Sequence, residues 1–419
     1  MTACSIKDVP SFERNHDAGS MAMLALEATL ATQGESRPAW WLAGMSGDAF
    51  KFVYDTGAVF EPLRDRVPLD VLTLACQAAG WTGHWRLAAR TGEITALVRA
   101  SVQRGCPVIT PFLGSRWYHG MVLIVGIDDT ARQFVLRTAR EDSRSCAGYQ
   151  TVAMPEHWDG PVPGGVAWAD TPLFVLAGRV SPPAPDALLG DALARAAQLH
   201  AGAPLPYADH PGAQRYSDAP LAGRAARQGE AALGALRQDL AEAELGDFAL
   251  IWRIDAQLGQ LHYDRANAAH FLRAVARANP ARGAHFLRAV VGAHPARGPL
   301  LEAALCYEAT ARIAARVQAA LWDKQLRQTP DLTGVRTGID AGTSLVHALG
   351  HLPREDIAAL GRDVAVLETP WGPAAIVDSP RRRQCILDLV DGIIANERRC
   401  VAMLQDAARN VGRGPPGRT

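Results

Sequence analysis

The most evident absence in this sequence is a net charge. Its 419 residues hold 43 Lys and Arg against 43 Asp and Glu, so no overall field attracts nucleic acid or an anionic membrane. Short basic stretches at 381–383 and 413–418 are interpreted as a solvated face and a disordered end. Neither nucleic acid nor a membrane is therefore expected as a partner.

Paired cysteines and long apolar runs are also missing. The seven cysteines form no CxxC pair, and their odd number leaves one without a partner in any complete disulfide scheme. The first eight residues lack the basic start and apolar run of a signal peptide. No stretch of eighteen or more apolar residues is free of a charge, a proline or a cluster of glycines, so no membrane span is predicted. These absences predict a cytoplasmic protein.

The common motifs for phosphate, dinucleotide and zinc binding are absent or incomplete. There is no GxxxxGK[ST] loop and no GxGxxG after a predicted strand. His347 and His351 have the i, i+4 spacing of a zinc-binding helix, but Ala348 stands where such a helix carries its Glu base. Gly350 and Pro353 favour the end of a helix with two ordinary histidines. No metal and no cofactor is predicted.

The apolar patterns that are present indicate an α+β first half and a helical second half. With 48% hydrophobic residues, the chain can bury a core and is long enough for two or three domains. Apolar runs of strand length lie at 107–111, 120–127, 133–137 and 173–176, with Asp128 and Asp129 as a hairpin turn between the second and third. We expect a first domain over 1–180, a Pro-rich linker over 181–186, an α-helical domain over 187–410 and a disordered tail over 411–419.

The helical half contains a tandem duplication with a period of 15 residues. Residues 269–275 recur at 284–290, and each copy is predicted to form one short helix that ends at its Pro and Gly. Two copies are too few for a solenoid. The repeated His270 and His285 are interpreted as residues on a helix face rather than as ligands.

Two segments carry residues that could support catalysis. In the first, Asp17 is expected to cap a helix that runs from Ala18 to about Thr32. In the second, His119 opens a buried apolar strand. A thiol at a helix start is pushed toward thiolate by the helix dipole, and a histidine at a strand edge could serve as its general base.

These segments, in this order, resemble the N-terminal domain of the butirosin biosynthesis protein H family and, more distantly, bacteriocin-processing papain-like cysteine peptidases. Those families place an Asp/His-Cys-Gly step at the start of a central helix, then a strand, then Gly-His and a Gly-Tyr-Asp-Asp turn. The matching stretches are 17–19, 105–109, 119–129 and 134–136, while 42–50 resembles a Gly-x-Ser-Gly-x-Ala-Phe signature of uncharacterised bacterial members. The resemblance covers about residues 5–178. It implies a papain-like domain with an antiparallel sheet and a central helix.

The resemblance also implies that the catalytic machinery is incomplete. The nucleophile position falls on Ala18, the base on His119 and the orienting acid near Arg137. The Gln that stabilises the oxyanion would fall near Phe12 or Glu13, and neither can donate an equivalent hydrogen bond. A single surviving histidine gives little catalysis without its partners.

Three functions remain open at this point. The first is an inactive peptidase homologue that keeps a ligand-binding cleft and, by resemblance, binds a small-molecule, acyl or peptide ligand, free or on a carrier protein of specialised metabolism. The mouth of that cleft would be formed by Asp17, Ala18, Gly19, Ser20, Trp117, Tyr118 and His119.

The second function is an active acyltransferase or amidase in which Cys4, Cys106 or Ser20 reaches His119. The simpler interpretations are that Ser20 hydrogen-bonds the first turn of a helix and that Cys106 is a small buried hydrophobe. The third function is a scaffold that binds a partner through its helical half.

Overall fold

The computed structural model describes residues 4–10, 20–55, 71–88, 91–111, 121–137, 149–154, 161–162, 166–167, 171–202, 226–242, 248–277, 295–321, 346–348, 364–369, 372–377 and 380–411. Every structural statement below concerns these ranges. None of the helices in them combines the length and apolar character needed to cross a bilayer.

An antiparallel sheet organises the first half of the chain, which confirms the predicted α+β class. Its strand order is β3-β10-β4-β5-β6-β7, and β1 pairs with β5. The strands are β1 (Cys4–Ser5), β3 (Trp81–Ala88), β4 (Val108–Pro111), β5 (Met121–Asp128), β6 (Gln133–Arg137), β7 (Tyr149–Ala153) and β10 (Thr171–Arg179). The predicted hairpin is present, because β5 pairs with β6 and the Asp128 carboxylate accepts the N–H groups of Thr130 and Ala131 at 2.9 Å.

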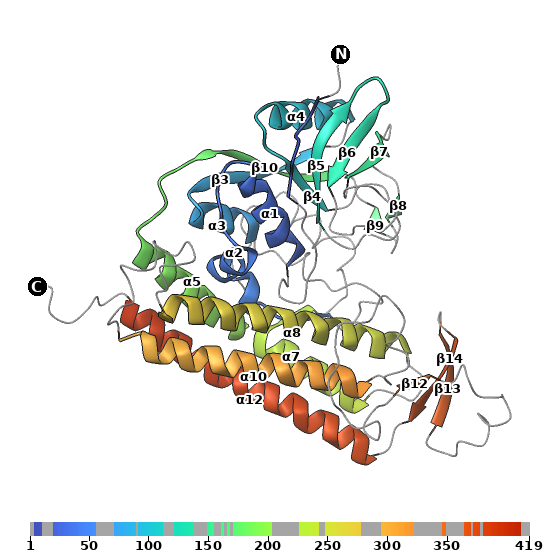
Figure 1. The fold of residues 1–419 in the computed structure, drawn as a ribbon. Helices are drawn as coiled ribbons and strands as arrows, with labels where there is room; N and C mark the ends of the chain where they lie inside the picture. Colours follow the sequence, from blue (N-terminus) through green and yellow to red (C-terminus); the bar gives the residue numbers. More distant parts are fainter. Residues whose placement is uncertain are drawn as a thin grey trace, which may run out of the picture.

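Both faces of this sheet are covered by helices. Alternate residues of β5 enter two separate clusters, since Leu123 and Val125 pack on the inner face and Val122 and Ile124 on the outer face. The inner face carries α1 (Met21–Ala31), α2 (Ala39–Ser46) and α3 (Val71–Ala78), and the outer face carries α4 (Thr91–Gln103). In Figure 1, α1 to α3 lie between the sheet and the long helices of the second half.

The second half is a bundle of long helices with a small sheet at one end (Figure 1). Its helices are α5 (Pro185–His200), α7 (Gly229–Glu242), α8 (Phe248–Arg277), α10 (Arg297–Leu321) and α12 (Pro380–Val411). The small sheet has the order β12-β14-β13, from β12 (Val346–Ala348), β13 (Val364–Thr369) and β14 (Gly372–Val377). The remaining pairs are β2 (Val53–Asp55) with β11 (Ala226–Gln228), and β8 (Pro161–Val162) with β9 (Val166–Ala167). A 3-10 turn, η1 (Asp48–Phe50), follows α2.

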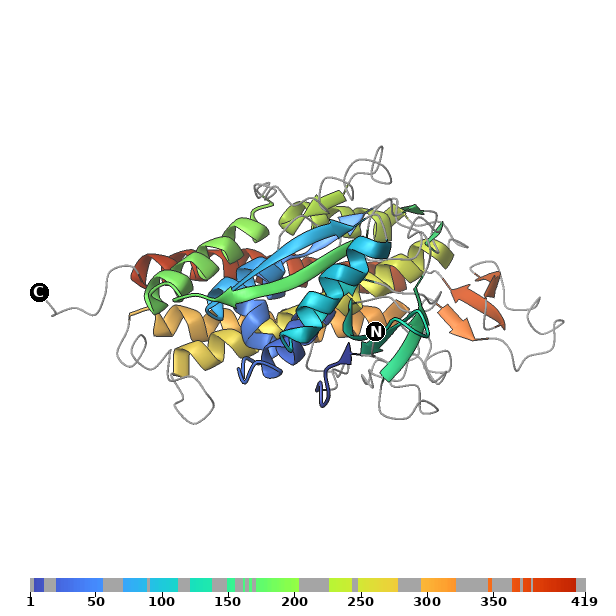
Figure 2. The ribbon, with the colours of Figure 1, turned by 90° about the horizontal axis from the view of Figure 1, so that it is seen from above.

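The two halves share buried side chains. One cluster joins residues of α1, α2 and α3 to residues of α5, α8, α10 and α12. Residues 181–184 between the halves are exposed and have no regular structure, whereas Pro185 and Asp186 already belong to the first turn of α5. Seen from above in Figure 2, the sheet and α4 lie across the bundle. The exposed segment therefore connects two parts with a common core.

Three local predictions are wrong. The central helix α1 begins at Met21 and not at Ala18, because Ser20 is its N-cap and has extended backbone angles. The first copy of the duplication is not a separate short helix, since it forms the last turns of the 30-residue α8. The second copy lies outside the described residues. His347 lies in β12 and not near the end of a helix, so the zinc-helix spacing has no helix to support it.

Candidate functional site

Ser20 is the one predicted cleft residue within the described ranges. Asp17, Ala18, Gly19, Trp117, Tyr118 and His119 lie outside them. The Ser20 side chain is 4% exposed, and its Oγ accepts the backbone N–H of Met23 at 3.4 Å. This capping bond is the first-turn role that the simpler interpretation predicts. It also places Ser20 at the positive end of the α1 dipole.

The direction of α1 follows from its contacts at the other end. The Thr32 hydroxyl and the Gln33 amide both donate to the carbonyl of Gly105, at 3.2 and 2.7 Å. Gly105 lies just before β4, so the C-terminus of α1 is at the start of that strand. From Thr32 back to Ser20 the helix covers about 18 Å, and the chain from Gly105 to Pro111, the last residue of β4, can span at most about 20 Å.

Because α1 packs on β4 and β5, its N-terminus lies toward the end of the sheet where Pro111 pairs with Met121. We call this the Met121 end of the sheet. His119 precedes Met121 by two residues in the chain. The helix N-terminus and the start of β5 therefore belong to the same end of the sheet.

Both candidate cysteines belong to the opposite end. Cys4 pairs with Ile127, which is about 20 Å along β5 from Met121. Cys106 is two residues before Val108, whose partner in β5 is Ile124. The Cys106 side chain is 5% exposed, and burial raises the pKa of its thiol although the charge of Arg104 partly opposes this. Of the three substitutes for the nucleophile, only Ser20 lies toward the Met121 end.

Arg137 also lies toward the Met121 end. It pairs with Leu123 in β5, is 7% exposed, and its guanidinium carbon is 4.7 Å from the centre of the Tyr149 ring. By resemblance this is where an acid would orient the catalytic histidine. A guanidinium has no acceptor, so it cannot take up the ring N–H of a histidine as a carboxylate does.

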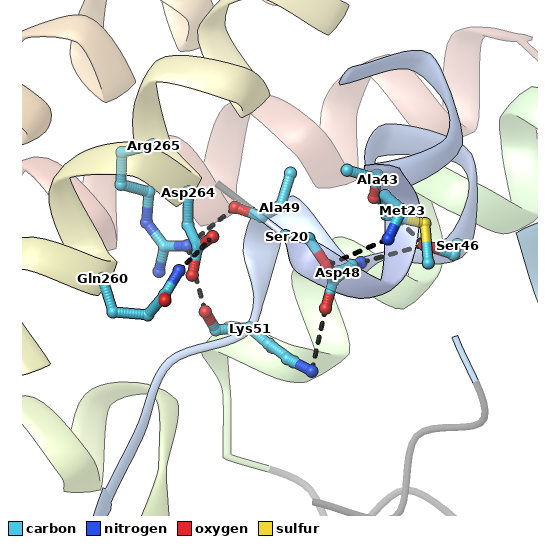
Figure 3. A network of polar contacts seen from close by, with 10 residues as sticks. All are labelled: Ser20, Met23, Ala43, Ser46, Asp48, Ala49, Lys51, Gln260, Asp264 and Arg265. Atoms are coloured by element: carbon cyan, nitrogen blue, oxygen red, sulfur yellow. Dashed lines mark hydrogen bonds and ion pairs between the residues drawn. The ribbon is translucent and has the colours of Figure 1, made fainter. Parts of the chain in front are cut away.

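The segment that follows α2 packs beside the first turn of α1 (Figure 3). The Ser46 hydroxyl accepts the N–H of Asp48 at 3.3 Å and lies 3.9 Å from the sulfur of Met23. Gly47, between Ser46 and Asp48, is the C-cap of α2. Its φ of 89° is a backbone conformation that favours glycine. A side chain there would also approach Arg195 to 3.0 Å. These requirements explain the glycine in the middle of the signature-like stretch.

This segment holds a buried ion pair. Lys51 Nζ lies 2.8 Å from the Asp48 carboxylate, and the two side chains are 2% and 1% exposed. A buried pair of this kind requires close geometry, because each charge has lost its water. The pair puts two charges into the core next to α2, whereas α1 is almost entirely apolar.

A second buried network connects this segment to the helix bundle. Arg265 of α8 donates from Nε and a terminal nitrogen to both oxygens of Glu397 of α12, at 2.8 and 2.9 Å. Its other terminal nitrogen donates to the carbonyls of Ala49 and Lys51, at 3.0 and 3.4 Å. Figure 3 shows Arg265 directed toward these two carbonyls. The bundle therefore holds the backbone of the 46–51 segment through one guanidinium.

The network continues through α5 and α10. His200 Nδ1 lies 2.8 Å from Glu397, and its Nε2 lies 2.5 Å from the hydroxyl of Tyr307. With a carboxylate on one side, the consistent assignment is that Nδ1–H donates to Glu397 and the Tyr307 O–H donates to Nε2. We call Arg265, Glu397, His200 and Tyr307 the Arg265–Glu397 network.

The electrostatics of the network favour a structural role. Burial alone would raise the pKa of Glu397, but the charge of Arg265 and the hydrogen bonds from Arg265 and His200 hold it at about 2. Burial also raises the pKa of Tyr307 well above its usual value. The order Tyr, His, Glu is that of a catalytic triad, yet the three residues are 0%, 3% and 3% exposed. No substrate reaches a hydroxyl packed in this way.

Sequence reasoning missed this network, although a signal for it exists. Arg265 follows Leu258 and Leu261 at helical spacing, and Glu397 follows Val390 and Ile393 in the same way. A charge at an apolar position of a helix is buried by the neighbouring residues and needs a partner of opposite sign. The spacing therefore predicts that each of these charges is buried and paired, without identifying its partner.

Comparison with protein-family models and with curated proteins finds no match to this chain. Among the described residues, no three His, Cys, Asp or Glu side chains gather into a metal-binding group.

Proposed function

We propose that this chain has a papain-like first half without a nucleophile, and that it binds an acyl or peptidyl ligand at the Met121 end of the sheet. The observation that carries the proposal is the direction of α1. A central helix whose N-terminus shares one end of an antiparallel sheet with the start of β5 is the layout that the resemblance implies. A ligand carbonyl there would lie near the positive end of the helix dipole.

The proposal of a binding role rather than hydrolysis is supported by three features. Ala18 offers no nucleophilic atom, Cys4 and Cys106 lie toward the opposite end of the sheet, and Arg137 replaces the orienting acid. The ligand would be a small acyl compound or peptide, free or attached to a carrier protein. This ligand class comes from the resemblance alone.

The test introduces a thiol at the nucleophile position. In Ala18→Cys, the nearby helix dipole and His119 should favour the thiolate, so its pKa should fall below the free value of about 8.5. We expect iodoacetamide at pH 6 to 7 to alkylate this thiol faster than the exposed Cys385, measured by peptide mass spectrometry. The rate should decrease in the double variant with His119→Ala, because only the dipole remains.

Ala31→Cys is the matched control, since position 31 is exposed at the opposite, negative end of α1. Its thiol should react no faster than Cys385. If the cysteine at position 18 reacts like this control, or is indifferent to His119, then the two positions do not face each other and the papain-like assignment fails.

A second function is favoured by the position of Ser20. Its hydroxyl lies at a helix N-terminus toward the Met121 end, so an acyltransferase or amidase that uses Ser20 and His119 is the alternative. Purified protein should show no turnover of peptide, ester or thioester probes above His119→Ala and Ser20→Ala controls. Turnover that both substitutions abolish would replace the binding role with this enzyme.

A further inference from the structure

Two buried thiols lie close together where α10 packs on α12. Cys400 of α12 donates a weak hydrogen bond from Sγ to the carbonyl of Ala303, at 3.8 Å. Cys306 lies three residues after Ala303, on the same face of α10. Cys306 is also among the neighbouring groups that raise the pKa of the Cys400 thiol. Cys400 is fully buried and Cys306 is 7% exposed, and both are free thiols.

The thiols adjoin the Arg265–Glu397 network. Tyr307 follows Cys306 directly in α10, and Glu397 precedes Cys400 by three residues in α12. A covalent bond between the two sulfurs would link these helices beside the hydrogen bonds that join them to α5 and α8.

We propose that Cys306 and Cys400 form a redox-sensitive pair, which a peroxide converts into a disulfide between α10 and α12. The peroxide first oxidises the Cys306 sulfur to a sulfenic acid and is reduced to water. The Cys400 sulfur then attacks the sulfenic sulfur, the S–O bond breaks, and the S–S bond forms. The hydroxyl leaves as a second water after it takes the Cys400 thiol proton.

The surroundings determine the order of these steps. Cys306 is the entry point because its side chain has the larger exposure of the two. Burial raises the pKa of the Cys400 thiol, and the neighbouring Glu397 charge raises it further, so Cys400 stays protonated until the sulfenic acid forms beside it. The pair should therefore respond to sustained oxidation rather than to brief exposure.

The other described cysteines do not offer an equivalent partner. Cys4 and Cys106 belong to the first half near β1 and β4, and Cys76 is buried in α3. Cys385 is exposed on α12 but lies about 22 Å along the helix from Cys400. Among the described cysteines, the fold therefore brings only Cys306 and Cys400 close together.

The experiment oxidises the reduced full-length protein with hydrogen peroxide, blocks remaining thiols with iodoacetamide under denaturing conditions, and maps peptides without reduction. We expect a linked pair of peptides containing Cys306 and Cys400. Its mass should be two hydrogen atoms below the summed masses of the two peptides with free thiols. The same link should form in Cys385→Ser and be absent from Cys306→Ser and Cys400→Ser. The urea midpoint of the oxidised protein should rise, and dithiothreitol should reverse the rise.

Cys306→Ser and Cys400→Ser are nearly isosteric, and circular dichroism checks that both remain folded. Oxidation confined to other cysteines, or a disulfide that joins Cys306 or Cys400 to a different thiol, would overturn the proposal. A 306–400 link that forms only after urea is added would overturn it as well, because the native packing would then not bring the sulfurs together.

Discussion

The Arg265–Glu397 network offers the sharpest test of how the two halves are held together. In Arg265→Met the Glu397 carboxylate stays buried without its main counter-charge, and the carbonyls of Ala49 and Lys51 lose their donor. Removing one partner of a buried ion pair costs about 3 to 5 kcal/mol of unfolding free energy. We expect a loss toward the upper end of that range, because the guanidinium makes four hydrogen bonds.

The assay is urea unfolding at pH 7, followed by tryptophan fluorescence. The matched control is Arg237→Met, because Arg237 forms the same two-bonded contact with Asp391, at 2.6 and 3.0 Å, between α7 and α12. That pair is 39% and 47% exposed, so water and salt screen it and its loss should change stability little. The comparison isolates burial, since both pairs have the same chemistry and both join two helices.

A double variant guards against a general effect of the substitution. Arg265→Met with Glu397→Gln removes both charges and leaves an amide oxygen that can accept from His200. We expect it to be more stable than Arg265→Met alone, because no unpaired buried charge remains. If Arg265→Met loses no more unfolding free energy than Arg237→Met, the network does not act as a coupled buried ion pair. The same holds if the losses of Arg265→Met and Glu397→Gln, measured separately, add up to the loss of the double variant.

The remaining predictions concern pH and packing. The pKa of Glu397 is about 2 in the folded protein against 4.5 for the ordinary group, so its contribution to stability is full above about pH 4.5 and is lost as the pH falls toward 2. The difference in unfolding free energy between the wild type and Glu397→Gln should shrink across that interval. In α2, a Cβ at Gly44 would lie 2.2 Å from the Phe271 ring, so Gly44→Ala should destabilise the protein by about 1 to 3 kcal/mol. In α7, a Cβ at Gly234 would have nothing within 4 Å, so Gly234→Ala should stabilise the protein by about 0.5 to 1 kcal/mol. Equal shifts of the thermal unfolding midpoint in Gly44→Ala and Gly234→Ala would contradict the close packing at Gly44.

The sheet could be predicted from the sequence because its central strands are continuous apolar runs. The predicted run at 120–127 is rich in Val, Leu and Ile, and β5 (Met121–Asp128), which covers most of it, is buried on both faces. The hairpin after Asp128 could be predicted as well, since an Asp at a turn accepts backbone N–H groups two and three residues ahead. Local chemistry was sufficient in these places.

The start of α1 could not be fixed in the same way. Asp17 and Ser20 are both good N-cap residues, so propensity alone does not choose between them. In the structure Ser20 is the N-cap, and Met23 of the first turn contacts Ser46, which lies 23 residues further along the chain. The long α8 was missed because the 15-residue duplication suggested separate short helices. In the structure one helix continues through the first copy, and it packs against α2 and α10.

The residues discussed for the site also fall into two groups, those found from the sequence and those found only from the structure. His119 and Ala18 were found through a resemblance in sequence order, whereas Arg265 and Glu397 required knowledge of which helices touch. Two charges that are 132 residues apart along the chain meet in the core only because α8 and α12 lie in one bundle. The sequence shows that each charge needs a partner, but it does not identify that partner.

The common core of the two halves has a consequence for how such a chain can evolve. The apolar faces of α2 and η1 are covered by α5 and α8, so a gene fragment encoding only the first half would yield a protein with exposed apolar surface there. Recombination at 181–184 would thus separate segments that cover each other's apolar surfaces. Selection should keep the halves together as a single heritable unit, even though the exposed prolines between them have the composition of a joint between independent modules.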